Sequence, residues 1–253
     1  MPQLGFMSSR AACLAALLGA SGALKHITLV RHGQTHANVW MRQPGNAWGA
    51  PGFRDPGLVD TRLTPEGEAQ AAALNAELLA DGARFDAVLC SPLSRALRTA
   101  QIALADVPIG AARRVRVTPL CSERVYLSSE VGRAPALLAA EFGATPFAGG
   151  PEFDGFDELD PRWWYGGFVA EVEAAIGGDW RPPGKYRNPA EPWGVFKRRM
   201  ERLLEALEQA DGERIAVVCH FGVASALLGE FLENCETRTV GLDELLAREI
   251  VEL

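Results

Sequence analysis

Three short apolar runs, rich in β-branched residues, divide the chain, and each is followed at once by polar residues. The runs lie at 26–30, 88–90 and 215–219. They are the length of strands, and the residue types that follow them are chemically active. We therefore predict buried strands that lead into functional loops.

Longer stretches between these runs carry apolar residues at helical spacing. Thr64 and Pro65 supply an N-cap and a first helical residue for one helix. Further helices are predicted over 94–104 and 193–207. We expect the charged residues of the last helix, Arg199 among them, to form a solvated face.

Strands that alternate with helices predict a three-layer α/β fold, in which helices flank a mainly parallel central sheet. The ligand site of such a fold lies at the carboxyl ends of the strands. We predict a single catalytic domain over 25–253. Residues 1–24 have the basic start, apolar centre and small-residue end of a targeting segment, or form an N-terminal extension. The Gly-, Pro- and Trp-rich stretch at about 149–192 is predicted to be a lid-like insertion.

Composition and charge exclude several classes of function. The formal net charge of −7 would repel the negatively charged backbone of nucleic acid, which argues against a nucleic-acid-binding protein. A pocket lined by arginines can still attract a small anion. The apolar run near the start is too short for stable membrane insertion. We expect a cytoplasmic location by default. Residues 1–24 leave an organellar location or secretion open. The cysteine spacing suggests no structural metal, and the sequence leaves the oligomeric state undetermined.

The first apolar run ends at Arg31-His32-Gly33, where a cation stands beside an imidazole. A phosphoryl group carries about −1.5 to −2 charges near neutral pH, so its transfer needs a nucleophile and several cationic donors. Neutral imidazole can be that nucleophile when a hydrogen bond fixes its second nitrogen. Glycine beside it allows close backbone approach.

The other two runs lead to side chains that suit the same chemistry. After the second run, Ser91-Pro92 opens a helix with Arg95 in its first turn, where a guanidinium can point at a shared pocket. The third run ends at His220, which precedes Gly222 and can donate a hydrogen bond to a phosphate oxygen. We predict that these groups converge on one anion.

In this order the motifs resemble the histidine phosphatase superfamily, which includes phosphoglycerate mutases and many phosphatases. The motifs are Arg31-His32-Gly33 followed by Asn38, Ser91-Pro92-Leu93 with Arg95, and His220 with Gly222. Two further segments resemble a plant and algal branch of mutase-like phosphatases: Trp163-Trp164-Tyr165 and Asn234-Cys235-Glu236. The resemblance runs from about His26 to Val240 and implies a phosphoglycerate mutase-like fold.

This resemblance implies a phosphomonoester hydrolase that forms a phosphohistidine intermediate on a small phosphorylated substrate, without a metal or cofactor. It makes His32 the phosphorylated nucleophile. The implied substrate-binding residues are Arg31, Asn38, Arg95 and His220. Glu123 is the implied general acid and base, and Glu130 is its nearest competitor.

Two other functions stay open from the sequence. A mutase would return the phosphoryl group to another substrate hydroxyl, but the chain lacks the tryptophan before the asparagine and the longer insertion of cofactor-dependent mutases. A catalytically silent member would only bind a phosphorylated ligand or partner. Cys219 and Phe221 depart from the family pattern, and we expect the bulky Phe221 to narrow the pocket.

Overall fold

The computed structural model describes most of the chain. The described residues are 24–47, 51, 53–111, 113–143, 148–176 and 191–252. The predicted N-terminal extension lies outside them, apart from Leu24. Residues 177–190 of the predicted lid segment also lie outside them. None of the helices within these ranges has the length and apolar character needed to cross a membrane.

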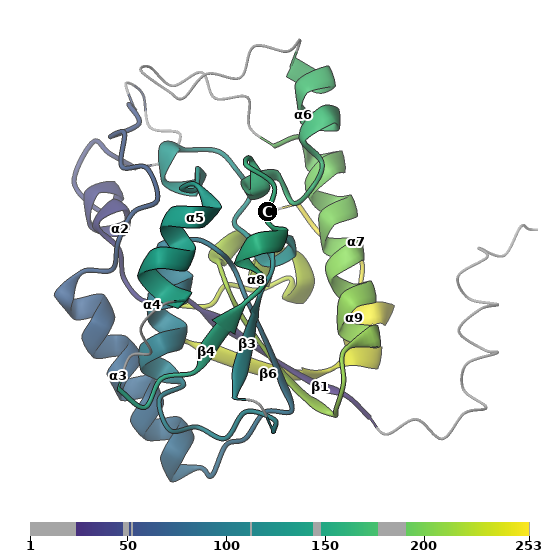
Figure 1. Ribbon diagram of the computed structural model, residues 1–253. Coiled ribbons are helices and arrows are strands. Elements are labelled where there is room, and N and C mark those ends of the chain that lie inside the picture. The colour runs from purple at the N-terminus through teal and green to yellow at the C-terminus, as the bar shows by residue number, and fades with distance from the viewer. Residues whose placement is uncertain are drawn as a thin grey trace, which may run out of the picture.

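Within the described residues, six strands form one sheet in the order β4-β3-β2-β5-β1-β6 (Figure 1). The strands are β1 (His26–Arg31), β2 (Ala87–Cys90), β3 (Arg114–Val117), β4 (Glu152–Asp154), β5 (Arg214–Cys219) and β6 (Thr237–Gly241). Every neighbouring pair is parallel except β1 and β6, which are antiparallel. The predicted α/β fold with a mainly parallel sheet is confirmed.

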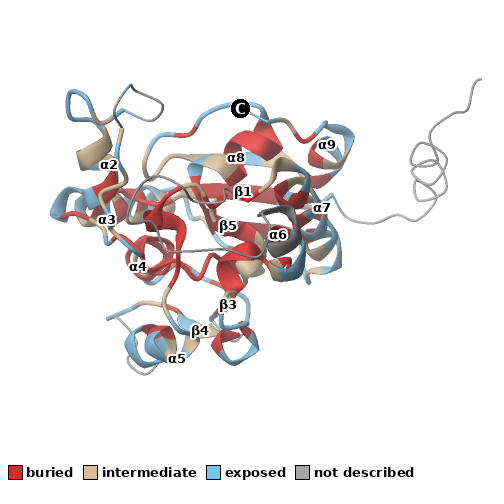
Figure 2. Ribbon diagram, turned by 90° about the horizontal axis from the view of Figure 1, so that it is seen from above, coloured by how far each residue is buried: buried red, intermediate tan, exposed pale blue. Residues whose placement is uncertain are grey.

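Side chains of the central strands alternate between two cores, one on each face of the sheet. In β5, Ala216 and Val218 face the first core, whereas Ile215 and Val217 face the second. Helices on the first core are α3 (Pro65–Ala80) and α4 (Ser94–Ala103); those on the second are α7 (Trp193–Gln209), α8 (Phe221–Leu228) and α9 (Leu242–Ala247). Figure 2 shows the buried strands between these two layers. The predicted three layers are therefore present.

Local signals set the helix starts where the sequence predicts them. The side chain of Thr64 accepts a hydrogen bond from the Gly67 N–H, so α3 begins at Pro65. The other helices and single turns are α2 (His36–Met41), η1 (Pro119–Cys121), η2 (Ser128–Glu130), α5 (Pro135–Leu138), η3 (Ala139–Gly143), η4 (Phe156–Glu158), η5 (Trp163–Tyr165) and α6 (Val169–Ile176).

The described part of the predicted lid segment packs into the molecule. It supplies β4 at the sheet edge, and Trp163, Trp164 and Tyr165 are buried in the first core. The Trp163 indole N–H also donates to the Arg133 carbonyl at 2.9 Å. A lid role for this segment stays a prediction, because residues 177–190 lie outside the described residues.

The expectation of a solvated Arg199 is wrong, because this side chain is fully buried. Its Nη2 lies 2.6 Å from Glu191 Oε2, and Glu191 is equally buried. Its Nη1 donates to the carbonyls of Leu120 and Ser122, at 3.1 and 2.5 Å, and its Nη2 donates to that of Glu123 at 3.2 Å. Full hydrogen bonding and an ion-pair partner make the buried charge tolerable.

Candidate active site

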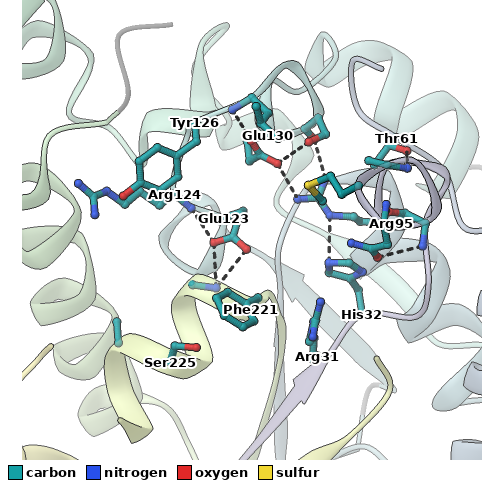
Figure 3. A pocket seen from close by; sticks show the side chains of 18 of the residues that line it. Arg31, His32, Thr61, Arg95, Glu123, Arg124, Tyr126, Glu130, Phe221 and Ser225 are labelled. Carbon is teal, nitrogen blue, oxygen red and sulfur yellow. Dashed lines mark hydrogen bonds and ion pairs between the residues drawn. The ribbon is translucent and has the colours of Figure 1, made fainter. Parts of the chain in front are cut away.

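Three neighbouring strands bring the predicted site residues to one edge of the sheet. β2, β5 and β1 run parallel, so their carboxyl ends meet there. Arg31 ends β1 and His32 follows it; His220 follows β5, and Arg95 lies in the first turn of α4. Figure 3 shows Arg31, His32 and Arg95 together at one end of a cavity. We call this the phosphate end.

The cavity has a volume of about 440 Å³. Its lining includes the following predicted site residues: Arg31, His32, Asn38, Arg95, Glu123 and Glu130. His220 joins this group through its contacts with Arg95 and with His32, whose ring centroid lies 5.1 Å from its own. The residues that the sequence predicts to converge are thus close together.

Two hydrogen bonds fix the imidazole of His32. Its Nδ1 lies 2.7 Å from the Gly33 carbonyl oxygen, which can only accept, so Nδ1 carries the proton. Its Nε2 accepts from Arg95 Nε at 3.3 Å, so a lone pair points toward the guanidinium. Gly33 is needed here because a Cβ at this position would lie 2.5 Å from the Gly67 carbonyl oxygen.

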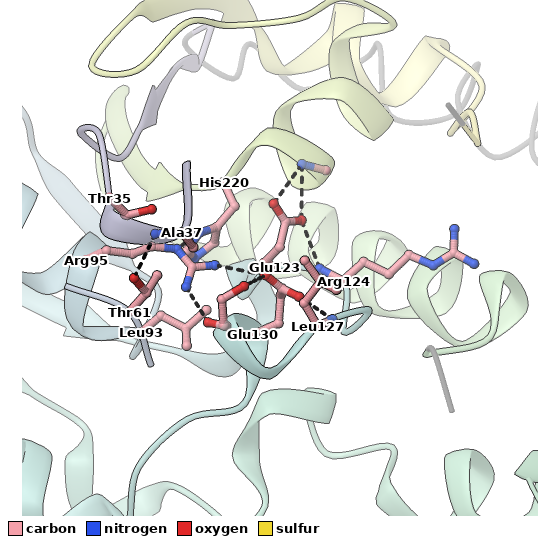
Figure 4. Close-up of polar contacts among 12 residues, drawn as sticks. Thr35, Ala37, Thr61, Leu93, Arg95, Glu123, Arg124, Leu127, Glu130 and His220 are labelled. Carbon is pink, nitrogen blue, oxygen red and sulfur yellow. Dashed lines mark hydrogen bonds and ion pairs between the residues drawn. The ribbon is translucent and has the colours of Figure 1, made fainter. Parts of the chain in front are cut away.

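His220 has the opposite tautomer, and its lone pair points at the same guanidinium. Its Nδ1 accepts from Arg95 Nε at 3.3 Å, so Nε2 carries the proton and donates to Ser91 Oγ at 2.7 Å. Figure 4 shows His220 beside Arg95. One Arg95 N–H is therefore shared by two imidazole nitrogens.

Burial keeps both imidazoles neutral. The pKa of His32 is lowered well below 6.5, first by burial and then by the charges of Arg95 and Arg31. Burial likewise lowers the pKa of His220 well below 6.5, with Arg95 the next largest cause. Both lone pairs are consequently available near neutral pH, which suits a nucleophile rather than a permanent cation.

Each arginine of the site is anchored by a backbone carbonyl. Arg95 Nη1 donates to the Ser129 carbonyl at 2.6 Å, and Arg31 Nη1 donates to the Leu232 carbonyl at 2.5 Å. The Arg31 guanidinium also lies over the Phe221 ring, 5.3 Å from its centroid. Burial lowers the pKa of Arg31 below its ordinary value. Phe221, which the sequence predicts to narrow the pocket, thus contacts a cation of the site.

The carboxylate of Glu123 is docked on the first turn of α8. Both of its oxygens accept from the Gly222 N–H at 3.1 Å, and Oε1 also accepts from the Arg124 N–H at 2.9 Å. A helix N-terminus stabilises a negative charge through its free N–H groups. Gly222 is required for this docking, because a Cβ there would clash with Glu123 Oε1.

Glu130 lies near Arg95 and is more deeply buried than Glu123. Its Oε1 accepts from Ser129 Oγ and lies 4.0 Å from Arg95 Nη2, while Oε2 accepts from the Leu127 N–H. Burial raises the pKa of Glu130 to about 7, against the lowering effects of Arg95 and Ser129. The cavity therefore holds two carboxylates in different environments.

The sequence of residues 27–144 matches the histidine phosphatase superfamily (branch 1), and this match includes the nucleophile motif and Arg95. The chain therefore contains a histidine phosphatase superfamily domain over these residues. An adenosylcobalamin/alpha-ribazole phosphatase of Salmonella typhimurium is 29% identical over 207 residues, which is 81% of this chain and 78% of that protein.

Two further proteins are similar to this chain, one over a short segment and one over most of its length. A 2-carboxy-D-arabinitol-1-phosphatase of Triticum aestivum is 44% identical over 79 residues, which is 31% of this chain and 13% of that protein. The crystal structure of the alpha-ribazole phosphatase from Shigella flexneri has a TM-score of 0.45 and 25% identity, and the match covers 85% of this chain and 89% of that one.

His220 lies outside residues 27–144, which match the family, and the fold brings it to the site. Other supporting residues were not predicted. Thr99 Oγ1 accepts from the Gly33 N–H at 3.0 Å and donates to the Arg95 carbonyl at 2.7 Å, which ties the two motifs together. Its place one helical turn after Arg95 is the only signal that the sequence carries for this role.

Asn234 connects the nucleophile loop to Asn38. Its Nδ2 donates to the His32 carbonyl at 3.0 Å and to Asn38 Oδ1 at 3.4 Å. Asn38 Oδ1 also accepts from the Thr35 N–H at 3.1 Å, so its amide NH₂ remains the group that can donate to a ligand. The sequence indicated Asn234 only through the family resemblance.

Proposed function

We propose that this histidine phosphatase hydrolyses a small phosphomonoester in two steps, with His32 as the group that carries the phosphate. The observation that supports this most is the shared position of Arg95 Nε, 3.3 Å from both His32 Nε2 and His220 Nδ1. Family membership and the phosphatase names of the relatives support hydrolysis. The lowered pKa of His32 favours the neutral imidazole that a nucleophile needs.

In the first step, the His32 Nε2 lone pair attacks phosphorus and the bond from phosphorus to the ester oxygen breaks. Arg31, Arg95 and Asn38 donate to the phosphoryl oxygens. The dianion favours uptake of a proton from solvent by His220 at Nδ1, which then donates as well and returns this proton to solvent when phosphate leaves. Glu123 takes up a proton from solvent when the anionic ester binds, gives this proton to the leaving oxygen and is a carboxylate again.

In the second step, water attacks the phosphohistidine. The Glu123 carboxylate takes a proton from this water as the new bond to phosphorus forms and the bond to Nε2 breaks. Inorganic phosphate leaves, and His32 returns to its neutral state. Arg95 is buried, Arg31 is partly buried, and both are fixed in advance by backbone carbonyls. Each therefore contributes on the order of 2.7–4 kcal/mol of transition-state stabilisation.

Phosphate release and trapping of the intermediate test this proposal. The wild-type chain should release phosphate from 4-nitrophenyl phosphate, and ¹⁸O from labelled water should appear in the product. Quenching with alkali during turnover of ³²P-labelled ester should leave acid-labile label on the protein. His32→Ala should lower phosphate release on the order of 10⁴-fold and abolish the label. His26→Ala, which alters an exposed histidine of the same strand, is the matched control.

Each alternative predicts another outcome. A mutase would return labelled phosphate to a second hydroxyl of a diol substrate, so that little ¹⁸O would enter free phosphate. A silent binding protein would bind the ester without label or release. A His32→Ala variant that is as active as wild type would overturn the assignment of the nucleophile.

A further inference from the structure

The cavity is longer than a phosphate group needs. The phosphate end holds Arg31, His32 and Arg95, and Glu123 lies between these groups and the Arg124–Tyr126 pair (Figure 3). If Glu123 protonates the leaving oxygen, the ester oxygen lies beside it. The rest of the substrate must then extend beyond Glu123, toward Tyr126.

That region of the cavity is aromatic. Tyr126, Trp193 and Phe196 all line it, and we call these three residues the aromatic end. Their rings surround the guanidinium of Arg124, whose carbon lies 4.7, 5.4 and 5.9 Å from the respective ring centroids. Phe196 is buried, whereas Tyr126 and Trp193 are partly exposed and can offer a face on which another flat group can stack.

The charge of Arg124 is already compensated. Its Nη1 lies 2.8 Å from Glu252 Oε1, and its Nε donates to the Glu191 carbonyl at 2.9 Å. Among the described residues, the other cations that line the cavity are Arg31 and Arg95, both at the phosphate end. Within the described ranges, a second anionic group on the substrate would therefore find no uncompensated cation at the aromatic end.

We propose that the aromatic end binds the leaving group, and that the substrates are phosphomonoesters of alcohols with a flat, uncharged aromatic or heteroaromatic ring. This inference rests on the proposed function, since it places the leaving group beyond Glu123. Small sugar-acid phosphates, which carry a second anion and no flat apolar surface, are poor substrates by the same reasoning.

Two alkyl esters with similar leaving oxygens separate ring binding from chemistry. The ratio of kcat/KM for 1-naphthylmethyl phosphate to that for ethyl phosphate should be roughly ten- to hundredfold, because stacking of a flat ring contributes at this level. 3-Phosphoglycerate should fall at or below ethyl phosphate. In Trp193→Ala the ratio should drop about tenfold, mainly through the KM of the naphthyl ester, and Trp193→Phe should restore most of it.

Trp40→Ala is the matched control, because Trp40 packs against Phe53 and is not among the residues that line the cavity. It should keep the wild-type ratio. A wild-type preference for ethyl phosphate or 3-phosphoglycerate, or an unchanged ratio in Trp193→Ala, would overturn the aromatic leaving group while hydrolysis stands. An increase in 3-phosphoglycerate turnover on Glu252→Gln would instead show that a second anion competes for Arg124. If no ester, 4-nitrophenyl phosphate included, releases phosphate, the proposed function itself fails.

Discussion

Glu123 and Glu130 line the same cavity, but the protein surrounds them in different ways. Glu123 is partly exposed, and both of its carboxylate oxygens accept from the Gly222 N–H at the start of α8. Glu130 is buried beside Arg95, and burial raises its pKa to about 7. The raised pKa alone would favour Glu130 as the proton donor. Position favours Glu123, because its charge acts on Arg31 at the phosphate end and its carboxylate makes no contact with Arg95. The Glu130 carboxylate is already held by Leu127, Ser129 and Arg95.

A residue with a shifted pKa is therefore not necessarily the one in the catalytic position. A general acid must first reach the leaving oxygen, and only then does its pKa matter. Glu130 satisfies a different need, since its Oε1 lies 4.0 Å from Arg95 Nη2 and its Oε2 accepts the Leu127 N–H. We infer that Glu130 holds the loop that anchors Arg95.

The largest expected effect comes from Glu123→Gln. Loss of a general acid lowers turnover about 10²- to 10⁴-fold when the leaving group is a poor one. We therefore expect that loss with ethyl phosphate, but a much smaller one with 4-nitrophenyl phosphate, whose leaving group needs little protonation. Glu130→Gln should lower both activities by a similar small factor. If only Glu130→Gln shows the dependence on the leaving group, the two roles are exchanged.

The second effect concerns stability and pH. The native protein keeps the Glu130 proton up to about pH 7, whereas the ordinary pKa is 4.5. Between these values the native state binds more protons than the unfolded chain, so the free energy of unfolding falls as pH rises. Glu130→Gln should remove this fall, which is on the order of a few kcal/mol.

Denaturant unfolding of wild type and Glu130→Gln at several pH values measures that effect. The buried histidines act in the opposite sense, because their lowered pKa values make stability fall as pH drops below about 6.5. Both proteins share this contribution, so it cancels in the difference between their unfolding free energies. Parallel curves would show that native Glu130 is ionised throughout this range.

The sequence predicted the strands and the site motifs that surround the two glutamates, but not the environment of each carboxylate. Short β-rich runs and the Thr64 cap are local signals, so strands β1, β2 and β5 and the start of α3 were predictable. Placement of Arg31, His32 and Arg95 followed from the rule that parallel strands end at one edge.

Contacts between distant segments carried no such signal. The burial of Arg199 depends on Glu191 and on carbonyls about 80 positions earlier in the chain, and its spacing in α7 looks like that of a surface residue. The choice between Glu123 and Glu130 likewise depends on Gly222 and Arg95, which belong to other elements. Side-chain environment of this kind is a tertiary property.

A smaller effect is expected from Gly222→Ala, which tests the docking of Glu123 without removing its carboxyl group. The new Cβ would occupy the place of Glu123 Oε1 and push a flexible side chain aside. Alanine favours the helix over glycine by about 1 kcal/mol, so the fold should hold. We expect about a tenfold loss with ethyl phosphate and little loss with 4-nitrophenyl phosphate. Equal losses on both esters would place the defect at the phosphate end instead.

The smallest expected effect comes from Ser129→Ala, which alters the environment of Glu130. Ser129 Oγ donates to Glu130 Oε1 and lowers the pKa of that carboxyl, while the Ser129 carbonyl separately accepts from Arg95 Nη1. Ser129→Ala removes only the first contact, so the pKa of Glu130 should rise further. The pH window in which wild-type stability falls should then extend above 7, by less than about one pH unit. Unfolding curves of Ser129→Ala and of Ser129→Ala/Glu130→Gln decide this, because the shift must vanish once Glu130 is replaced.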